Sequence, residues 1–280
     1  MSKVAVVTDS VAMLPEQLAK DLGIRVVPIV LNLGERSYRD GIDLTTSEFY
    51  QLLRTSEELP TTSAPSAGEF VRVLEEALSD AEAVVAIHVS SELTSVLRIA
   101  QLAARSITDK PVRVVDSQSA TMAEGFVVLA AARTAQAGAD LDEVVAAAEE
   151  VRSKVRFFAF FETLEYLRRG GRVGAAAALM GNAIQLKPIV HIVDGRVTPL
   201  ARPRTRSKAT QAMIDIMAAE VGNRPVHVAV LHADSLLDAQ NLRTRLEKQF
   251  NCLEMHVTEM TPVMGTHTGP GLLGLAYYVD

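Results

Sequence analysis

Short apolar runs alternate with helix-like segments through the first half of the chain, and this alternation constrains the fold more than any other feature. Val4 to Val7, Ala83 to Val89 and Val112 to Val115 have the length and β-branched content of buried strands. Ile24 to Leu31 is a further strand candidate, and the alanine-rich Ala120 to Ala137 is typical of a helix. This order predicts an α/β fold with a mostly parallel N-terminal sheet covered by helices on both faces.

The second half of the chain follows a different pattern. Asp194-Gly195 lies between the strand-like runs Ile189 to Val193 and Val197 to Ala201, which is typical of a β-hairpin. A hairpin among helices predicts a second α/β domain with a mixed sheet. Since 280 residues are enough for two domains, we expect an N-terminal domain over residues 1–150 and a C-terminal domain over residues 151–280, with a boundary uncertain by about 10 residues.

Composition argues against several classes of protein. The 28 basic and 34 acidic residues give a formal charge of -6, so a nucleic-acid partner is not expected. Cys252 is the single cysteine, and it can form neither an internal disulfide nor a cysteine metal cluster. No apolar run approaches about 18 residues, and the first residues lead directly into a strand-like run. We therefore expect a cytoplasmic protein without a metal or a cofactor.

Positive charge is concentrated in one segment of this acidic chain. Residues 164–208 contain nine basic side chains and only two acidic ones. Such an asymmetry indicates an anionic ligand, an anionic partner or a membrane surface. Solvated helix ends would give the same charge run, so this alternative stays open.

Polar side chains follow three of the predicted strands. Asp9-Ser10, Ser90-Ser91 and Asp116-Ser117 all stand where a parallel sheet places its ligands, beyond the carboxyl ends of the strands. Thr61 to Ser66 and Ser90 to Ser95 each precede a helix-like segment. Their hydroxyls and the free amides of a first helical turn suit a carboxylate or a phosphate, although helix capping explains either segment taken alone.

His267 stands within the glycine-rich segment Gly265 to Gly271. Three glycines and a proline predict a tight backbone that exposes the imidazole. The imidazole could then donate a hydrogen bond to an anion or act as an acid or base.

The order and spacing of these motifs resemble the DegV family, which includes the fatty-acid-binding subunits of bacterial fatty acid kinase. The resemblance covers nearly the whole chain. It is carried by Thr8-Asp9-Ser10, Thr62-Ser63-Ala64-Pro65-Ser66, Ser90 to Ser95, Val115-Asp116-Ser117, Leu164 to Arg172, Lys187-Pro188, Val197 to Ala209 and His267-Thr268-Gly269-Pro270-Gly271.

The resemblance implies one long-chain fatty acid, buried in a tunnel between two α/β domains. It assigns the carboxylate to Thr62, Thr94 and His267, with Ser63, Ser95 and Thr268 as further candidates. Three positions depart from the family pattern: Ala64 replaces glutamine, Thr94 replaces serine and Ser95 replaces glycine. We expect the tunnel wall to include the alanine-rich segment Ala175 to Leu186.

The function implied is that of a carrier without catalytic residues of its own. It would present the bound carboxylate to a separate kinase subunit, which would supply ATP and form the acyl phosphate. A monomer is expected. Basic residues would contact the kinase or, transiently, an anionic membrane surface: Arg168, Arg169, Arg172, Arg202, Arg204 and Arg206.

Two alternatives remain. A hydrolase or phosphotransferase acting on a small anionic substrate would use Asp9, Asp116 and His267 as its acid, nucleophile and base. A lipid-sensing regulator would share the pocket of the carrier and differ only in its partner.

Overall fold

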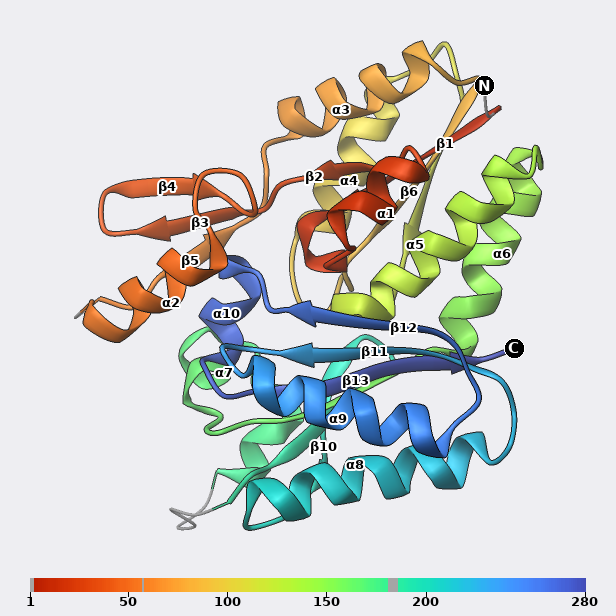
Figure 1. The fold of residues 1–280 in the computed structure, drawn as a ribbon. Helices are drawn as coiled ribbons and strands as arrows, with labels where there is room; N and C mark the ends of the chain where they lie inside the picture. Colours follow the sequence, from red (N-terminus) through yellow and green to blue (C-terminus); the bar gives the residue numbers. More distant parts are fainter. Residues whose placement is uncertain (1–2, 57, 181–185) are drawn as a thin grey trace.

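A parallel four-stranded sheet forms the core of the N-terminal half in the computed structural model, which describes residues 3–56, 58–180 and 186–280 (Figure 1). The strand order is β2-β1-β6-β7, and every pair is parallel, as predicted. Helices α3 and α4 pack together on one face, and α5 and α6 on the other. The elements are β1 (Val4–Asp9), α1 (Glu16–Asp21), β2 (Arg25–Val27), α3 (Ala67–Ser79), β6 (Ala83–His88), α4 (Val96–Ser106), β7 (Val112–Asp116), α5 (Thr121–Gln136) and α6 (Leu141–Lys154).

A six-stranded mixed sheet forms the second domain, in the order β10-β9-β8-β13-β11-β12. Only its β11–β12 pair is parallel. The predicted hairpin is confirmed, because Asp194 and Gly195 join β9 to β10 with φ of 49° and 78°, as a type I′ turn requires. The elements are β8 (Arg156–Phe160), β9 (Ile189–Val193), β10 (Arg196–Ala201), α8 (Arg206–Val221), β11 (Val226–His232), α9 (Leu236–Gln249), β12 (Cys252–Glu259) and β13 (Leu273–Val279).

A small antiparallel sheet, in the order β4-β3-β5, extends from the first domain. The prediction of one strand over Ile24 to Leu31 was wrong, because the chain leaves the parallel sheet after Val27 and enters the small sheet at Val30. Pro28 lies at the break and has no N–H to give to either ladder. The remaining elements are η1 (Ser10–Ala12), β3 (Val30–Leu33), β4 (Arg36–Arg39), α2 (Thr46–Thr55), β5 (Thr61–Ser63), α7 (Glu165–Arg169), η2 (Gly174–Leu179) and α10 (Pro262–Thr268).

Helix α5 lies between the two large sheets and contacts strands of both, among them β1 and β13 (Figure 1). Twelve of its residues are buried, and most of them have small or aliphatic side chains. Packing is tight at Gly125, where an added Cβ would lie 2.7 Å from the backbone oxygen of Ala12. The helix therefore packs closely against η1 while it contacts strands of both sheets.

No helix within residues 3–56, 58–180 and 186–280 is both long and apolar enough to cross a membrane. In the same ranges, no three His, Cys, Asp or Glu side chains are grouped so that they could hold a metal ion.

Candidate functional site

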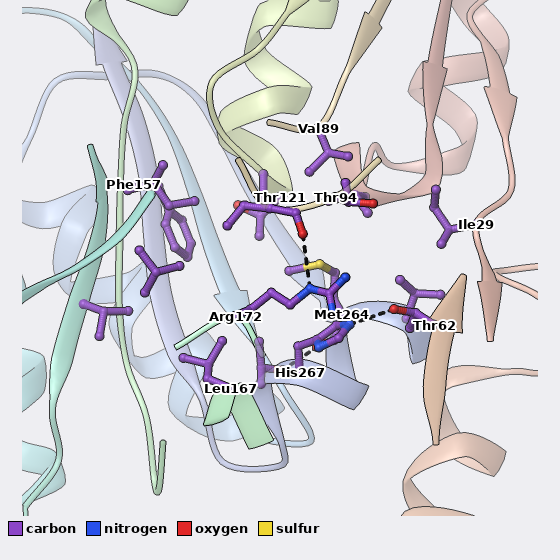
Figure 2. Close-up of a pocket in the computed structure, with 18 of the residues that line it drawn as sticks. Ile29, Thr62, Val89, Thr94, Thr121, Phe157, Leu167, Arg172, Met264 and His267 are labelled. Atoms are coloured by element: carbon purple, nitrogen blue, oxygen red, sulfur yellow. Dashed lines mark hydrogen bonds between the residues drawn. The ribbon is translucent and has the colours of Figure 1, made fainter. Parts of the chain in front are cut away.

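An apolar cavity lies between the two domains, and both contribute to its walls (Figure 2). Val89 follows a strand of the parallel sheet, whereas Phe157 belongs to a strand of the mixed sheet. The apolar walls are formed by Val11, Ile29, Val89, Leu93, Val96, Ala120, Phe157, Phe161, Leu167, Val190, Ile192, Val197, Val263 and Met264. This composition suits a hydrocarbon chain.

Thr62 and His267 form a polar pair at one end of this cavity. Thr62 Oγ1 lies 2.8 Å from His267 Nε2, and the two atoms share a hydrogen bond (Figure 2). Thr62 belongs to β5 of the small sheet, and His267 to the last turn of α10. Phe157 lies toward the opposite end of the view, so the cavity has one polar end and one apolar end.

Local sequence signals explain why His267 lies on a helix. The Thr261 side chain caps the first turn of α10, Pro262 follows it, and Gly269 ends the helix with a φ of 66°. Buried Asp40 accepts a hydrogen bond from the Val263 N–H, 3.1 Å away, and so joins α10 to the end of β4. The prediction of a tight loop that exposes the imidazole was wrong, because the ring faces the cavity instead.

Gly170 leaves room for the imidazole. A Cβ at this position would lie 2.3 Å from His267 Nδ1, so any larger residue would displace the ring. Helix α7 ends at Arg169, and Gly170 caps it. The close approach of Gly170 to His267 could not be recognised without the fold.

The imidazole of His267 is neutral near neutral pH. Burial, and then the nearby positive charge of Arg172, lower the pKa of His267 to about 4. Its Nδ1 has no hydrogen-bond partner among the described residues. A neutral imidazole beside a hydroxyl can donate hydrogen bonds to an anion without a fixed charge of its own.

Arg172 lines the cavity, unlike the other basic residues proposed from the sequence as surface contacts. Its Nε donates to Leu93 O at 3.1 Å, and its Nη1 donates to Gly170 O at 2.5 Å. These two carbonyls hold the guanidinium close to His267. Arg172 is thus a residue of the polar end that the sequence assigned to another role.

The other five arginines lie outside the cavity lining. Arg168 and Arg169 are exposed and pair with Glu165. Arg206 pairs with Glu162 and Asp238. Arg202 and Arg204 are exposed.

The remaining hydroxyl candidates divide into two groups. Thr94 and Thr268 line the cavity, although the Thr268 hydroxyl donates to Met264 O within its own helix. Ser63 and Ser95 are exposed and are not among the lining residues. The amides of α3 are also less available than expected, because Ser66 caps that helix.

A second depression, the outer depression, shares Thr62, Arg172 and His267 with the apolar cavity. Its other walls include Thr61, Tyr166 and Arg169. Thr61 and Arg169 are exposed. The polar end can therefore be approached from the protein surface through the outer depression.

Neither aspartate of the enzyme alternative lies with His267. Asp9 is fully buried, where it accepts hydrogen bonds from the Val11 and Val89 amides and contacts His88. Asp116 accepts hydrogen bonds from Ser91 and from the Gln118 amide. Neither aspartate lines the apolar cavity, so this structure does not bring the three residues of that alternative together.

The tunnel wall expected over Ala175 to Leu186 is only partly described, because residues 181–185 lie outside the described ranges. Residues 175–180 belong to η2 or end it, and none of them lines the cavity. Among the described residues, strands β8 and β9 contribute Phe157, Val190 and Ile192 to the wall.

Known proteins share both the sequence and the fold. The family described as an uncharacterised protein, DegV family, matches residues 3–280. A DegV domain-containing protein of Streptomyces coelicolor is 42% identical over 97% of this chain and 97% of its own. Protein DegV of Bacillus subtilis is 32% identical over 98% of both chains.

Two solved structures have the same fold along the entire chain. A Thermus thermophilus structure, described as fatty acid binding of a DegV family protein, is 36% identical with a TM-score of 0.93 and covers 100% of both chains. DegV of Bacillus subtilis, described as a fatty acid binding protein, is 30% identical with a TM-score of 0.90 and the same coverage. With a family match over residues 3–280 and relatives of this similarity, the chain belongs to the DegV family.

Proposed function

We propose that this protein binds one long-chain fatty acid, with the acyl chain in the apolar cavity and the carboxylate at Thr62, Thr94 and His267. The observation that carries the proposal is a mostly apolar cavity whose lining includes the hydrogen-bonded pair Thr62 and His267. Each buried methylene contributes about 0.8 kcal/mol, so a long chain supplies most of the affinity. The polar end then fixes the direction in which the chain enters.

The donors at the polar end suit a carboxylate. A buried carboxylate must be hydrogen-bonded, because an unpaired charge in an apolar site is very costly. The single N–H of neutral His267 can donate to Thr62 Oγ1, which leaves the Thr62 hydroxyl free to donate to the carboxylate. The Thr94 hydroxyl supplies a second donor, and the Arg172 guanidinium lies nearby as a counter-charge. The relatives from Thermus thermophilus and Bacillus subtilis described as fatty acid binding support the same ligand class.

We further propose that the protein presents the bound carboxylate to a separate kinase subunit, which forms the acyl phosphate. The outer depression supports this idea, because it gives the polar end a face toward the surface. Arg169 lines the outer depression, its chain neighbour Arg168 is also exposed, and both could contact an acidic partner. On this proposal the kinase supplies the nucleotide and the catalytic groups.

Mass spectrometry tests the binding proposal directly. The protein is purified from a bacterial host without added lipid and measured under native and then denaturing conditions. We expect a native adduct that releases a free long-chain fatty acid on denaturation. A protein that is empty, and that also fails to take up added palmitate or oleate, would contradict the proposal.

A coupled assay tests presentation to a kinase. The loaded protein is incubated with a fatty acid kinase subunit, ATP and Mg²⁺, and acyl phosphate is trapped with hydroxylamine as the hydroxamate. Charge reversal at Arg168 and Arg169 should slow the coupled reaction without changing fatty acid binding. The matched control is Arg105→Glu, an exposed arginine on α4. If the charge-reversed protein and Arg105→Glu gave equal rates in the coupled assay, Arg168 and Arg169 would not belong to the partner surface.

A further inference from the structure

A second cavity, the rear cavity, lies between the domains next to the apolar cavity. Its walls come from the loop after β7, the end of α6, strands β8 and β9, and helix α8. Several of its lining residues are polar or charged, including Ser117, Arg152, Arg156, His191 and Glu220. The rear cavity is therefore far more polar than the cavity that ends at Thr62 and His267.

Phe157 and Ile192 line both cavities and are the only residues that the two linings share within the described ranges. Phe157 lies away from Thr62 in Figure 2, toward the apolar end of the cavity. We refer to Phe157 and Ile192 together as the end wall. On one side of the end wall the lining is hydrocarbon, and on the other side it is polar.

The strand geometry explains how two residues make a wall. Side chains alternate along β8, so Phe157, Ala159 and Phe161 pack in the core between the domains, whereas Phe158 and Phe160 face the core beneath α8 and α9. Strands β8 and β9 are antiparallel, with Phe158 opposite His191 and Ala159 opposite Val190.

That register places Phe157 beside Ile192, as a cross-strand pair on the face that lines the apolar cavity. Phe161 lies four residues further along, directly after the end of β8, and its amide donates to Pro188 O. Phe161 lines the apolar cavity but not the rear cavity. The chain thus offers two aromatic residues on one face, of which one separates the cavities and the other does not.

We propose that the end wall of Phe157 and Ile192 sets the longest acyl chain that the protein accepts. A chain that ends before the wall keeps all its methylenes in apolar surroundings. A longer chain would have to displace a buried phenyl ring and pass into the polar rear cavity, where further methylenes gain little. The end wall therefore selects fatty acids by the length of the acyl chain as well as by its apolar character.

This inference rests on the proposed fatty acid binding, and a competition experiment tests it. Wild type, Phe157→Ala and Phe161→Ala are each offered an equimolar mixture of saturated fatty acids of about 12 to about 22 carbon atoms. The bound acids are released by denaturation and identified by mass spectrometry. We expect Phe157→Ala to shift the upper length limit upward by about two to four carbon atoms, because the removed ring opens the wall.

Phe161→Ala is the matched control. Both phenylalanines are buried, with 8% and 3% of their surface exposed, and both variants lose the same ring from the same strand face. Phe161→Ala widens the apolar cavity but leaves the end wall closed, so any upward shift of its length limit should be smaller than that of Phe157→Ala. An equal length profile in wild type and Phe157→Ala, or an equal shift in both variants, would overturn the proposal.

A milder variant covers the case in which Phe157→Ala does not fold. Ile192→Ala removes less volume from the same wall and should shift the limit in the same direction, whereas Phe157→Trp should lower it. Circular dichroism establishes which variants are folded, and unchanged limits in the folded ones would contradict the end wall. If wild type takes up no fatty acid at all, the proposed function fails instead, so the two failures are distinguishable.

Discussion

Thr62 and His267 are 205 positions apart in the chain, yet their side chains meet at 2.8 Å between Oγ1 and Nε2. One comes from an edge strand of the small sheet and the other from the short helix that connects β12 to β13 of the mixed sheet. Asp40 strengthens this junction by accepting the Val263 amide at the start of the same helix. The polar end of the cavity therefore exists only when the small sheet and the second domain are joined.

Thr62→Val tests the threonine as a carboxylate donor. The change keeps the size of the side chain and removes one hydrogen bond to a charged acceptor, which is worth roughly 1.5–3 kcal/mol. We expect fatty acid affinity to fall by about tenfold to about a hundredfold, measured by titration with a fluorescent fatty acid. Ser63→Ala is the control, because Ser63 is exposed and contacts Asn32 instead. Equal losses in both variants would argue against a specific role for Thr62.

Gly170→Ala tests the close approach of the backbone to the imidazole. The new Cβ would lie 2.3 Å from His267 Nδ1, and overpacking of this kind costs about 1–3 kcal/mol. The imidazole must move, so fatty acid affinity should fall while most of the fold remains. Gly68→Ala in α3 is the control, since an added Cβ there meets nothing closer than 3.8 Å. Wild-type affinity in Gly170→Ala would show that the position of the imidazole does not matter for binding.

Arg172→Met tests the electrostatic coupling at the polar end. The positive charge of Arg172 helps to hold the pKa of His267 low, so its removal should raise that pKa. NMR titration of the imidazole protons in the ligand-free protein measures the change. Arg168→Met should leave the pKa of His267 unchanged, because Arg168 is exposed and pairs with Glu165. If the pKa of His267 is the same in Arg172→Met and Arg168→Met, the coupling is refuted.

His267→Gln tests the linkage between pH and stability. Burial lowers the pKa of His267 from 6.5 to about 4, so between these values the unfolded chain binds a proton that the folded chain does not. The contribution of His267 to the free energy of unfolding therefore decreases as pH falls from about 6.5 to about 4, by up to about 3 kcal/mol.

The variant lacks this titration. Wild type should therefore lose free energy of unfolding relative to His267→Gln as the pH falls. Urea unfolding of both proteins without ligand measures this change. A difference that stays constant across this window would mean that the folded protein protonates His267 as readily as the unfolded chain does.

Local sequence patterns were sufficient for the parallel sheet and the β9–β10 hairpin. Val84 to Ile87 are apolar and fully buried, as expected of a central strand, and Asp194-Gly195 specifies its turn through backbone conformation alone. Such signals act over a few residues. They failed at Pro28, where one apolar run is divided between two sheets.

The site depends on contacts that no local pattern encodes. Thr62, Thr94 and His267 were grouped by resemblance to a family, and the structure places all three at one cavity. Arg172 was grouped with surface arginines, because nothing in the sequence distinguishes it from Arg168 or Arg169 before the Leu93 and Gly170 carbonyls are in position. The sequence likewise does not distinguish Phe157 from Phe161. Only the structure shows that Phe157 also lines the rear cavity.

The burial of α5 on both sides has a consequence for sequence variation in this protein. A surface helix has one face on which substitutions are nearly neutral, but twelve residues of α5 are enclosed between two sheets. A larger residue at Gly125 would push against Ala12 O and move α5 away from η1. Ala120 and Thr121 at the start of this helix also line the cavity, so a substitution elsewhere in α5 that shifts the helix would be expected to change the shape of the cavity.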